Sequence, residues 1–274
     1  MDHEELPAIP PVGPSLRRAA IGALVPRRAR PGEMKQLLVR RATVDSGRLD
    51  AYDDLCGFPR AATLPATYAH VLAFPISLAV MTRPGFPFPI LGLVHIANRI
   101  EVLRAIAVEE PLDLWVRADN VQAHERGTTV DLLTTVDAAG AAVLRESSTY
   151  LRRHGGAPGR GRGDRDTVPV AEQEWDVTGS LVSAYARVSG DPNPIHTSAL
   201  FARMFGFPHR IAHGMWTLAR ALAALGPFEA PYTVDARFQL PIVLPARVGF
   251  ARAGAAFSVH DVATGRPNLQ GTVS

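Results

Sequence analysis

Residues 212–225 read AHGMWTLARALAAL, and residues 69–81 read AHVLAFPISLAVM. Both runs are rich in apolar residues and have almost no polar face, which predicts two helices that are buried on nearly all sides. Each run is followed by stretches in which apolar and polar positions alternate between Gly or Pro breaks, as they do in antiparallel strands. A buried helix followed by several antiparallel strands predicts a sheet wrapped around a helix, and the chain contains this arrangement twice.

The two halves of the chain share further residues in the same order. The hexapeptide YDDLCG at 52–57 precedes the first helix, and YARVSG at 185–190 precedes the second. Matches that recur in one order predict a duplicated domain. The interval from the hexapeptide's Gly to the His of the following Ala-His pair is 13 positions in the first half and 23 in the second. The second copy therefore holds ten extra residues, and insertions on a preserved scaffold often carry function.

Composition divides the chain into four segments. Residues 1–34 are expected to form a mobile leader with about one helical turn. Their acidic start is unlike the positively charged start of a signal peptide, so we do not expect an export signal. Residues 35–151 form the predicted N-terminal domain, and residues 170–274 the C-terminal one. Between them, residues 152–169 are dominated by Gly, Pro and charge, which predicts a linker.

The overall composition excludes several classes of protein. Of the 274 residues, 47% are apolar and 20% are charged, which is the balance of a globular protein with a core. The single cysteine, Cys56, excludes an intramolecular disulfide and favours the cytoplasm. A net charge of +3 gives too weak a field to predict nucleic-acid binding. No apolar run approaches the roughly 20 residues of a spanning helix, so we expect no membrane partner.

The extra residues of the second copy include an acid–base pair. Asp191 and His196 are five positions apart in a loop that two prolines stiffen. Asn193 lies between them and can hold one partner by a hydrogen bond, and Thr197 is predicted to cap the helix that follows. An acid and a base on one stiff loop can act on the same face of a substrate.

Gly214 lies at the predicted start of the second buried helix. A helix N-terminus presents unpaired N–H groups and the positive end of the helix dipole, and glycine lets a ligand carbonyl approach closely. These features predict an oxyanion site, although helix packing alone could also require the glycine. With the acid–base pair they suit abstraction of a proton next to a thioester, or its reverse.

The run SGDPNPIH at 189–196, followed by GFP at 206–208 and IAHGM at 211–215, resembles the signature of the MaoC-like, (R)-specific enoyl-thioester hydratase family. From about residue 35 onward the chain resembles bacterial double-hotdog 3-hydroxyacyl-thioester dehydratases. That resemblance includes TYAHVLAFP, FPFPILGLVHIANRI and RFQLPIVLP. It implies an α+β fold of two hotdog domains, each an antiparallel sheet around a long helix.

The resemblance also implies roles for individual residues. Asp191 and His196 would form a dyad around one water, and the Gly214 N–H would hold the thioester oxygen. Ser189, Asn193 and His213 would support the dyad, with His213 either bonding backbone or lining the pocket. The first half lacks the equivalent loop, so it would shape the acyl pocket. The candidate substrate-binding residues are Tyr68, His70, His95, Phe207, Ile211 and Met215, of which the first three could instead be satisfied polar groups of the core.

The implied activity is reversible syn dehydration of (3R)-hydroxyacyl thioesters, or hydration of trans-2-enoyl thioesters, in fatty-acid metabolism. Two alternatives remain open, a hotdog thioesterase and a non-catalytic acyl-thioester binding subunit, because one fold hosts several functions. The reaction needs no cofactor beyond the phosphopantetheine of CoA or of an acyl carrier protein. No metal is expected, since His209 and His213 lack a further ligand cluster. The chain would act as a monomer or a homodimer.

Overall fold

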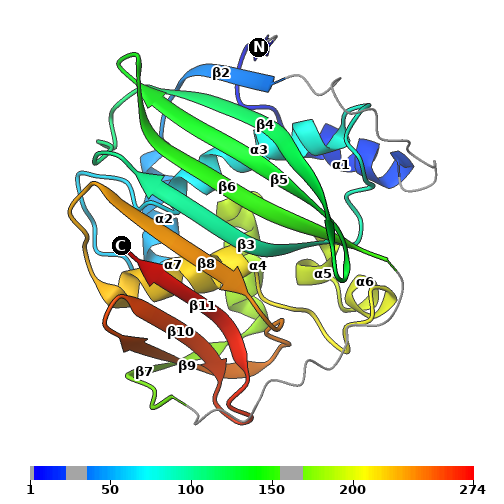
Figure 1. The fold of residues 1–274 in the computed structure, drawn as a ribbon, viewed down its shortest axis with the longest axis vertical. Helices are drawn as coiled ribbons and strands as arrows, with labels where there is room; N and C mark the ends of the chain where they lie inside the picture. The colour runs from blue at the N-terminus through cyan, green and yellow to red at the C-terminus, as the bar shows by residue number, and fades with distance from the viewer. Residues whose placement is uncertain (1–2, 23–35, 155–168) are drawn as a thin grey trace. The chain divides into compact units, whose positions relative to one another are not determined.

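The structure is a computed structural model that describes residues 3–22, 36–154 and 169–274 (Figure 1). The chain divides into two compact units. Unit 1 consists of Met1–Ser46, Ala61–His154 and Glu229–Tyr232, and unit 2 of Gly47–Arg60, Gly155–Phe228 and Thr233–Ser274. Each unit contains a series of paired strands and one long buried helix, so the mixed α+β class predicted from the sequence is confirmed.

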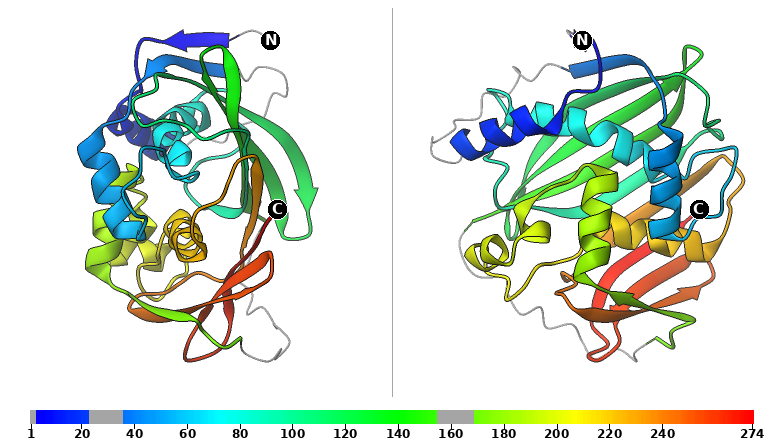
Figure 2. Two further views of the ribbon diagram at one scale, coloured as in Figure 1. Left: turned by 90° about the vertical axis from the view of Figure 1, so that its left-hand side faces the viewer. Right: turned by 180° about the vertical axis from the view of Figure 1, so that it is seen from behind.

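In unit 1 the strands pair in the order β1-β2-β4-β5-β6-β3. Only β1 and β2 are parallel, and the other neighbours are antiparallel. Helix α3 (Tyr68–Thr82) lies along one face of this sheet (Figure 2), and all its residues except His70 are buried. The strands are β1 (His3–Leu6), β2 (Gln36–Ala42), β3 (Leu93–Val102), β4 (Leu112–His124), β5 (Gly127–Ala138) and β6 (Ala141–Arg153).

Unit 2 is an antiparallel sheet with the order β7-β9-β10-β11-β8, and helix α7 (Gly214–Leu225) packs against β10 and β11. Its strands are β7 (Gln173–Val177), β8 (Tyr232–Phe238), β9 (Ala246–Ala253), β10 (Ala256–Asp261) and β11 (Pro267–Val273). Four further helices belong to this unit, namely α2 (Ser46–Cys56), α4 (Gly179–Ser189), α5 (Pro194–Thr197) and α6 (Ala199–Met204).

The two units repeat one topology, which confirms the predicted duplication. Strands β2, β4, β5, β6 and β3 pair in the same order as β7, β9, β10, β11 and β8. Helices α2 and α4 both end at a glycine with positive φ, Gly57 at 81° and Gly190 at 72°. Each of these glycines donates its N–H to the carbonyl four residues earlier. The additional residues of the second copy form α5 and α6.

The prediction of a leader with about one helical turn is wrong for the described residues 3–22. Strand β1 pairs with β2, and α1 (Val12–Gly22) packs against α3. Long-range partners that the local sequence does not reveal stabilise these elements, and Glu4 pairs with Arg83 at 2.6 Å. Most of the predicted linker, residues 155–168, lies outside the described residues.

One helix of the N-terminal half belongs to unit 2, which the sequence did not predict. Within unit 2, the Nε1–H of Trp216 donates to the Leu55 carbonyl at 3.0 Å, and Arg48 Nε donates to the Val188 carbonyl at 2.6 Å. The side chains of Tyr52 and Tyr185 also pack together, with ring centroids 6.1 Å apart. Among the helices that the structure describes, none is long and apolar enough to cross a membrane.

Candidate active site

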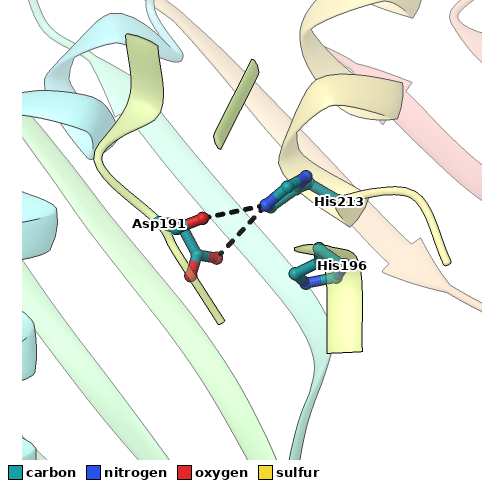
Figure 3. Close-up of side chains that lie close together, drawn as sticks. All are labelled: Asp191, His196 and His213. Atoms are coloured by element: carbon teal, nitrogen blue, oxygen red, sulfur yellow. Dashed lines mark hydrogen bonds and ion pairs between the residues drawn. The ribbon is translucent and has the colours of Figure 1, made fainter. Parts of the chain in front are cut away.

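Asp191 begins the loop that leaves α4, directly after the glycine that ends the helix (Figure 3). Its carboxylate Oδ1 accepts the N–H of Asn193 at 3.1 Å, and its own N–H donates to Ser189 Oγ at 3.3 Å. The Ser189 hydroxyl in turn donates to the Tyr185 carbonyl at 2.7 Å. These bonds fix the start of the loop while 24% of the Asp191 side chain stays exposed to solvent.

His196 is carried by α5, a single helical turn that Asn193 caps. The side-chain oxygen of Asn193 accepts the N–H of Ile195 at 3.3 Å, and Pro194 occupies the first turn, where its missing N–H costs nothing. The predicted capping role of Thr197 is wrong, because Thr197 is the last residue of α5. Ser198 stands at the N-cap of α6, and its side chain makes no capping bond. The predicted cap thus lies one residue before the N-cap of α6.

The His196 ring is held in a defined tautomer. Its Nδ1 lies 2.8 Å from the Ile211 carbonyl oxygen, which can only accept, so Nδ1 carries the proton. The lone pair of the neutral ring is then on Nε2. Burial lowers the pKa of His196 below its ordinary value of 6.5, an effect that the negative charge of Asp191 partly opposes. His196 is therefore a neutral base at pH 7.

His213 ties the loop to the start of α7. Its Nε2–H donates to the backbone carbonyl of Asp191 at 3.1 Å, and its ring stacks on His196 with centroids 3.8 Å apart. Burial, followed by the nearby His196, lowers the pKa of His213 well below 6.5. His213 stays neutral and bonds backbone, which was one of the two alternatives left open by the sequence.

One side-chain oxygen or ring nitrogen from each of Asp191, His196 and His213 lies within 4.8 Å of those of the other two. The carboxylate and the two imidazoles come from a loop, a short helix and the N-cap of a long helix, and Figure 3 shows them converging. Each ring has one nitrogen bonded to a backbone carbonyl, which leaves Nε2 of His196 for other chemistry, whereas Nδ1 of His213 is buried without a hydrogen-bond partner among the described residues. The absence of a bound metal stays a prediction.

Gly214 is the first residue of α7, and its N–H makes no hydrogen bond to any other residue that the structure describes. A Cβ at this position would lie 2.9 Å from a ring carbon of Phe238, closer than real Cβ atoms come. The glycine thus has a packing role. That role is compatible with an oxyanion role, because the side-chain position and the N–H are different parts of the residue.

Three predicted substrate-binding residues belong to the same part of unit 2. Ile211 supplies the carbonyl that orients His196 and donates its N–H to Ile195 O at 3.3 Å. Met215 is buried in the first turn of α7. Phe207 follows α6 and is half-buried. Their contact with an acyl chain stays a prediction.

The other three predicted substrate-binding residues lie in unit 1. Tyr68 is the buried first residue of α3. His70 Nδ1 donates to Glu146 Oε1 at 2.6 Å, and the His70 and His95 rings stack at 5.9 Å. Burial lowers the pKa of His95 to about 3, and its ring stacks on Tyr150 at 4.6 Å. The two histidines therefore take part in a polar network of the unit 1 core, and their predicted substrate contacts stay a prediction.

Sequence reasoning missed the centre of this network, Glu146. One of its oxygens accepts from His70, from Asn98 Nδ2 at 2.6 Å and from the Ser148 hydroxyl at 3.1 Å. Burial raises the pKa of Glu146, but the charge and hydrogen bond of His70 and the bond from Asn98 outweigh it, so the net pKa is lowered. The signal was the strand alternation, which places Glu146 on the same face as the buried Leu144 and Ser148.

Comparison with known proteins identifies a family and a relative that this chain resembles. Residues 161–244 match the family model described as a MaoC like domain. The chain is 35% identical to 3-hydroxyacyl-thioester dehydratase X of Mycobacterium tuberculosis, over 94% of this chain and 96% of the relative.

Solved structures agree as well. The crystal structure of HtdX from M. tuberculosis superposes with a TM-score of 0.79 at 32% identity, covering 87% of this chain and 99% of that one. Another M. tuberculosis protein, described as a double hotdog fold, superposes with a TM-score of 0.51 at 14% identity, covering 91% and 96% of the two chains. The predicted double hotdog is thereby confirmed, and the chain belongs to the MaoC-like dehydratase family.

Proposed function

We propose that this protein catalyses the reversible addition of water to trans-2-enoyl thioesters, which yields (3R)-hydroxyacyl thioesters. The observation that carries the proposal is the convergence of a carboxylate, a neutral imidazole with a free Nε2 and the start of α7. The name of the M. tuberculosis relative, a 3-hydroxyacyl-thioester dehydratase, supports the same reaction.

In the hydration direction, the Asp191–His196 pair holds one water molecule. His196 Nε2 is the free nitrogen of a neutral ring, so it can take a proton as the water oxygen bonds to C3. The pair returns one proton to C2, so the OH and H of one water are added and the pair ends as it began. Because Asp191 and His196 are five residues apart, on a loop and on the short helix α5 that follows it, both additions take place on the same face of the substrate.

As the water oxygen adds, the thioester oxygen gains enolate character and negative charge. The N–H of Gly214, at the positive end of a 12-residue helix, supplies a donor for that oxygen. All these steps are proton transfers and hydrogen bonds, so we propose no cofactor beyond the pantetheine arm that carries the acyl group. We further propose that the protein works in the cytoplasm, where such substrates occur and a single free cysteine stays reduced.

Incubation with crotonyl-CoA tests the function directly. We expect the enoyl absorbance to fall without release of free thiol, and the product to be the (3R) isomer. Release of thiol with the enoyl chromophore intact would instead identify a thioesterase. Binding without turnover across a series of chain lengths would identify a binding subunit.

The pH dependence follows from the state of His196. A base must be unprotonated to act, and burial lowers the pKa of His196 below 6.5. We therefore expect kcat/KM for crotonyl-CoA to be flat near pH 7 and to fall only as the pH drops below about 6.5. Since the Asp191 charge raises this pKa, Asp191→Asn should shift the His196 titration to still lower pH, measured by NMR of the imidazole. A shift to higher pH would contradict the assignment.

A further inference from the structure

Helix α6 exposes an unusual share of apolar surface for its length. Leu200 is 67% exposed, Phe201 40% and Met204 70%, and only Ala202 of the six helix residues is buried. Among the large apolar residues exposed in the described chain, only Val170 exceeds Leu200 and Met204. Residues three and four apart share a helix face, so Leu200, Met204 and the exposed Arg203 form one patch with Phe201. We call these four residues the α6 surface.

The α6 surface lies next to the catalytic histidine along the chain. His196 is in α5, and Ser198 joins α5 to α6, donating its N–H to Pro194 and accepting the N–H of Ala202. Figure 1 shows α5 and α6 side by side. A partner bound on α6 would thus be held close to the acid–base pair.

The α6 surface carries the positive charge of Arg203, and the chain that flanks it in sequence is poor in carboxylates. Between residues 178 and 228 the chain has four arginines and a single carboxylate, which is the proposed catalytic Asp191. None of these arginines forms an ion pair with a described carboxylate. Elsewhere, surface arginines commonly do, as Arg104 does with Glu110 and Arg252 with Glu172. Arg203 donates to the Pro208 carbonyl at 3.4 Å, which places it beside the exposed His209.

We propose that the α6 surface docks an acidic helix of an acyl carrier protein, which delivers the thioester on its phosphopantetheine arm. This inference rests on the proposed function. The Arg203 guanidinium, which forms no ion pair with a described carboxylate, complements an acidic side chain, and the exposed Leu200 and Met204 complement the apolar residues of an amphipathic helix. The nucleotide of CoA offers phosphates to the arginines but no aliphatic surface for Leu200 and Met204.

The test compares two substrates that share one acyl group, crotonyl-CoA and a bacterial acyl carrier protein loaded with a crotonyl-phosphopantetheine arm. In Arg203→Glu and in Leu200→Ser/Met204→Ser, we expect KM for the crotonyl-carrier to rise by about tenfold or more. The kcat/KM for crotonyl-CoA should stay within about twofold of wild type, because the substituted side chains are exposed and have no assigned part in the acid–base step. Added salt should raise KM for the carrier substrate in the wild type and less in Arg203→Glu.

Matched controls lie in the same unit. Arg237→Glu reverses an exposed arginine of β8, and Val262→Ser removes an exposed apolar side chain that follows β10. Both should leave KM for the carrier substrate unchanged.

Four results would overturn the docking proposal. The first is an equal loss of activity on both substrates in the α6 variants, and the second is unchanged kinetics in all variants. The third is a wild type that turns over crotonyl-CoA but not the carrier substrate. The fourth is α6-dependent binding of anionic vesicles by a protein with normal kinetics on the carrier substrate. A wild type inactive on both substrates would overturn the proposed function itself, so the two failures can be told apart.

Discussion

Asp191→Asn and His196→Asn are each expected to lower kcat for crotonyl-CoA hydration by about 10²–10⁴-fold, which is the usual range for loss of an acid–base group. Asn at 191 keeps an oxygen that can accept the Asn193 N–H but loses the charge. Asn at 196 can place its amide nitrogen near the position of Nδ1, so the bond to the Ile211 carbonyl can persist while the base is lost. Both changes therefore remove chemistry with little change in shape.

Steady-state rates and thermal melts of the purified variants check this expectation. The double variant should be hardly slower than either single one, because residues that act as a unit lose their effect together. Thr197→Val is the control, since this exposed residue adjoins His196 and has no assigned role. Wild-type turnover by Asp191→Asn would remove the carboxylate from the mechanism. Multiplicative losses in the double variant would show that the two groups act in separate steps.

The second large effect concerns stability. Glu146→Ala is expected to reduce the free energy of unfolding by about 3–5 kcal/mol, because it leaves the buried Asn98 and the largely covered His70 without their shared acceptor. For a chain of this size the loss corresponds to a fall in Tm of about 10 °C. Glu101→Ala is the matched control, since its pair with Arg99 is 34–49% exposed and should be worth at most about 1 kcal/mol.

The same network makes stability depend on pH with a definite sign. The folded protein lowers the pKa of Glu146 below the ordinary 4.5, so the ionised pair stabilises the fold above that pH. This contribution should be lost as the pH falls through the lowered pKa, and Glu146→Gln should lack that loss. Denaturant unfolding of both proteins at a series of acidic pH values measures the difference. An equal pH dependence in the two proteins would assign the acid sensitivity to other carboxylates.

The sequence predicted what its local patterns determine. The two apolar runs became α3 and α7, because a helix without a polar face can only be stable when buried. The Asp191–His196 loop could be identified because its glycine, prolines and capping Asn193 fix its backbone within a few residues. The tautomer of His196 was not accessible, because it depends on a carbonyl 15 residues away.

Contacts distant in sequence account for what was missed. Glu146 and His70 are 76 residues apart, and each alone looks like an ordinary residue of a strand or a helix. Similarly, nothing near Gly214 indicates that the Phe238 ring packs on it, and β1 depends on a partner strand more than 30 residues further on. The alternation of buried and exposed positions along the strand does indicate that Glu146 faces inward. A charged residue at an inward-facing strand position therefore indicates a buried polar network.

Helix α2 lies in the N-terminal half of the chain but belongs to unit 2, so the two units are not two consecutive segments of the chain. Residues Gly47–Arg60 belong to unit 2. A polypeptide that began after residue 169 would therefore contain the candidate active site but lack the Leu55 carbonyl that accepts the Nε1–H of Trp216. It would also lack Tyr52, whose ring packs on Tyr185, and Arg48, which donates to the Val188 carbonyl. A division of the chain into two stable polypeptides would therefore have to keep α2 with the C-terminal portion.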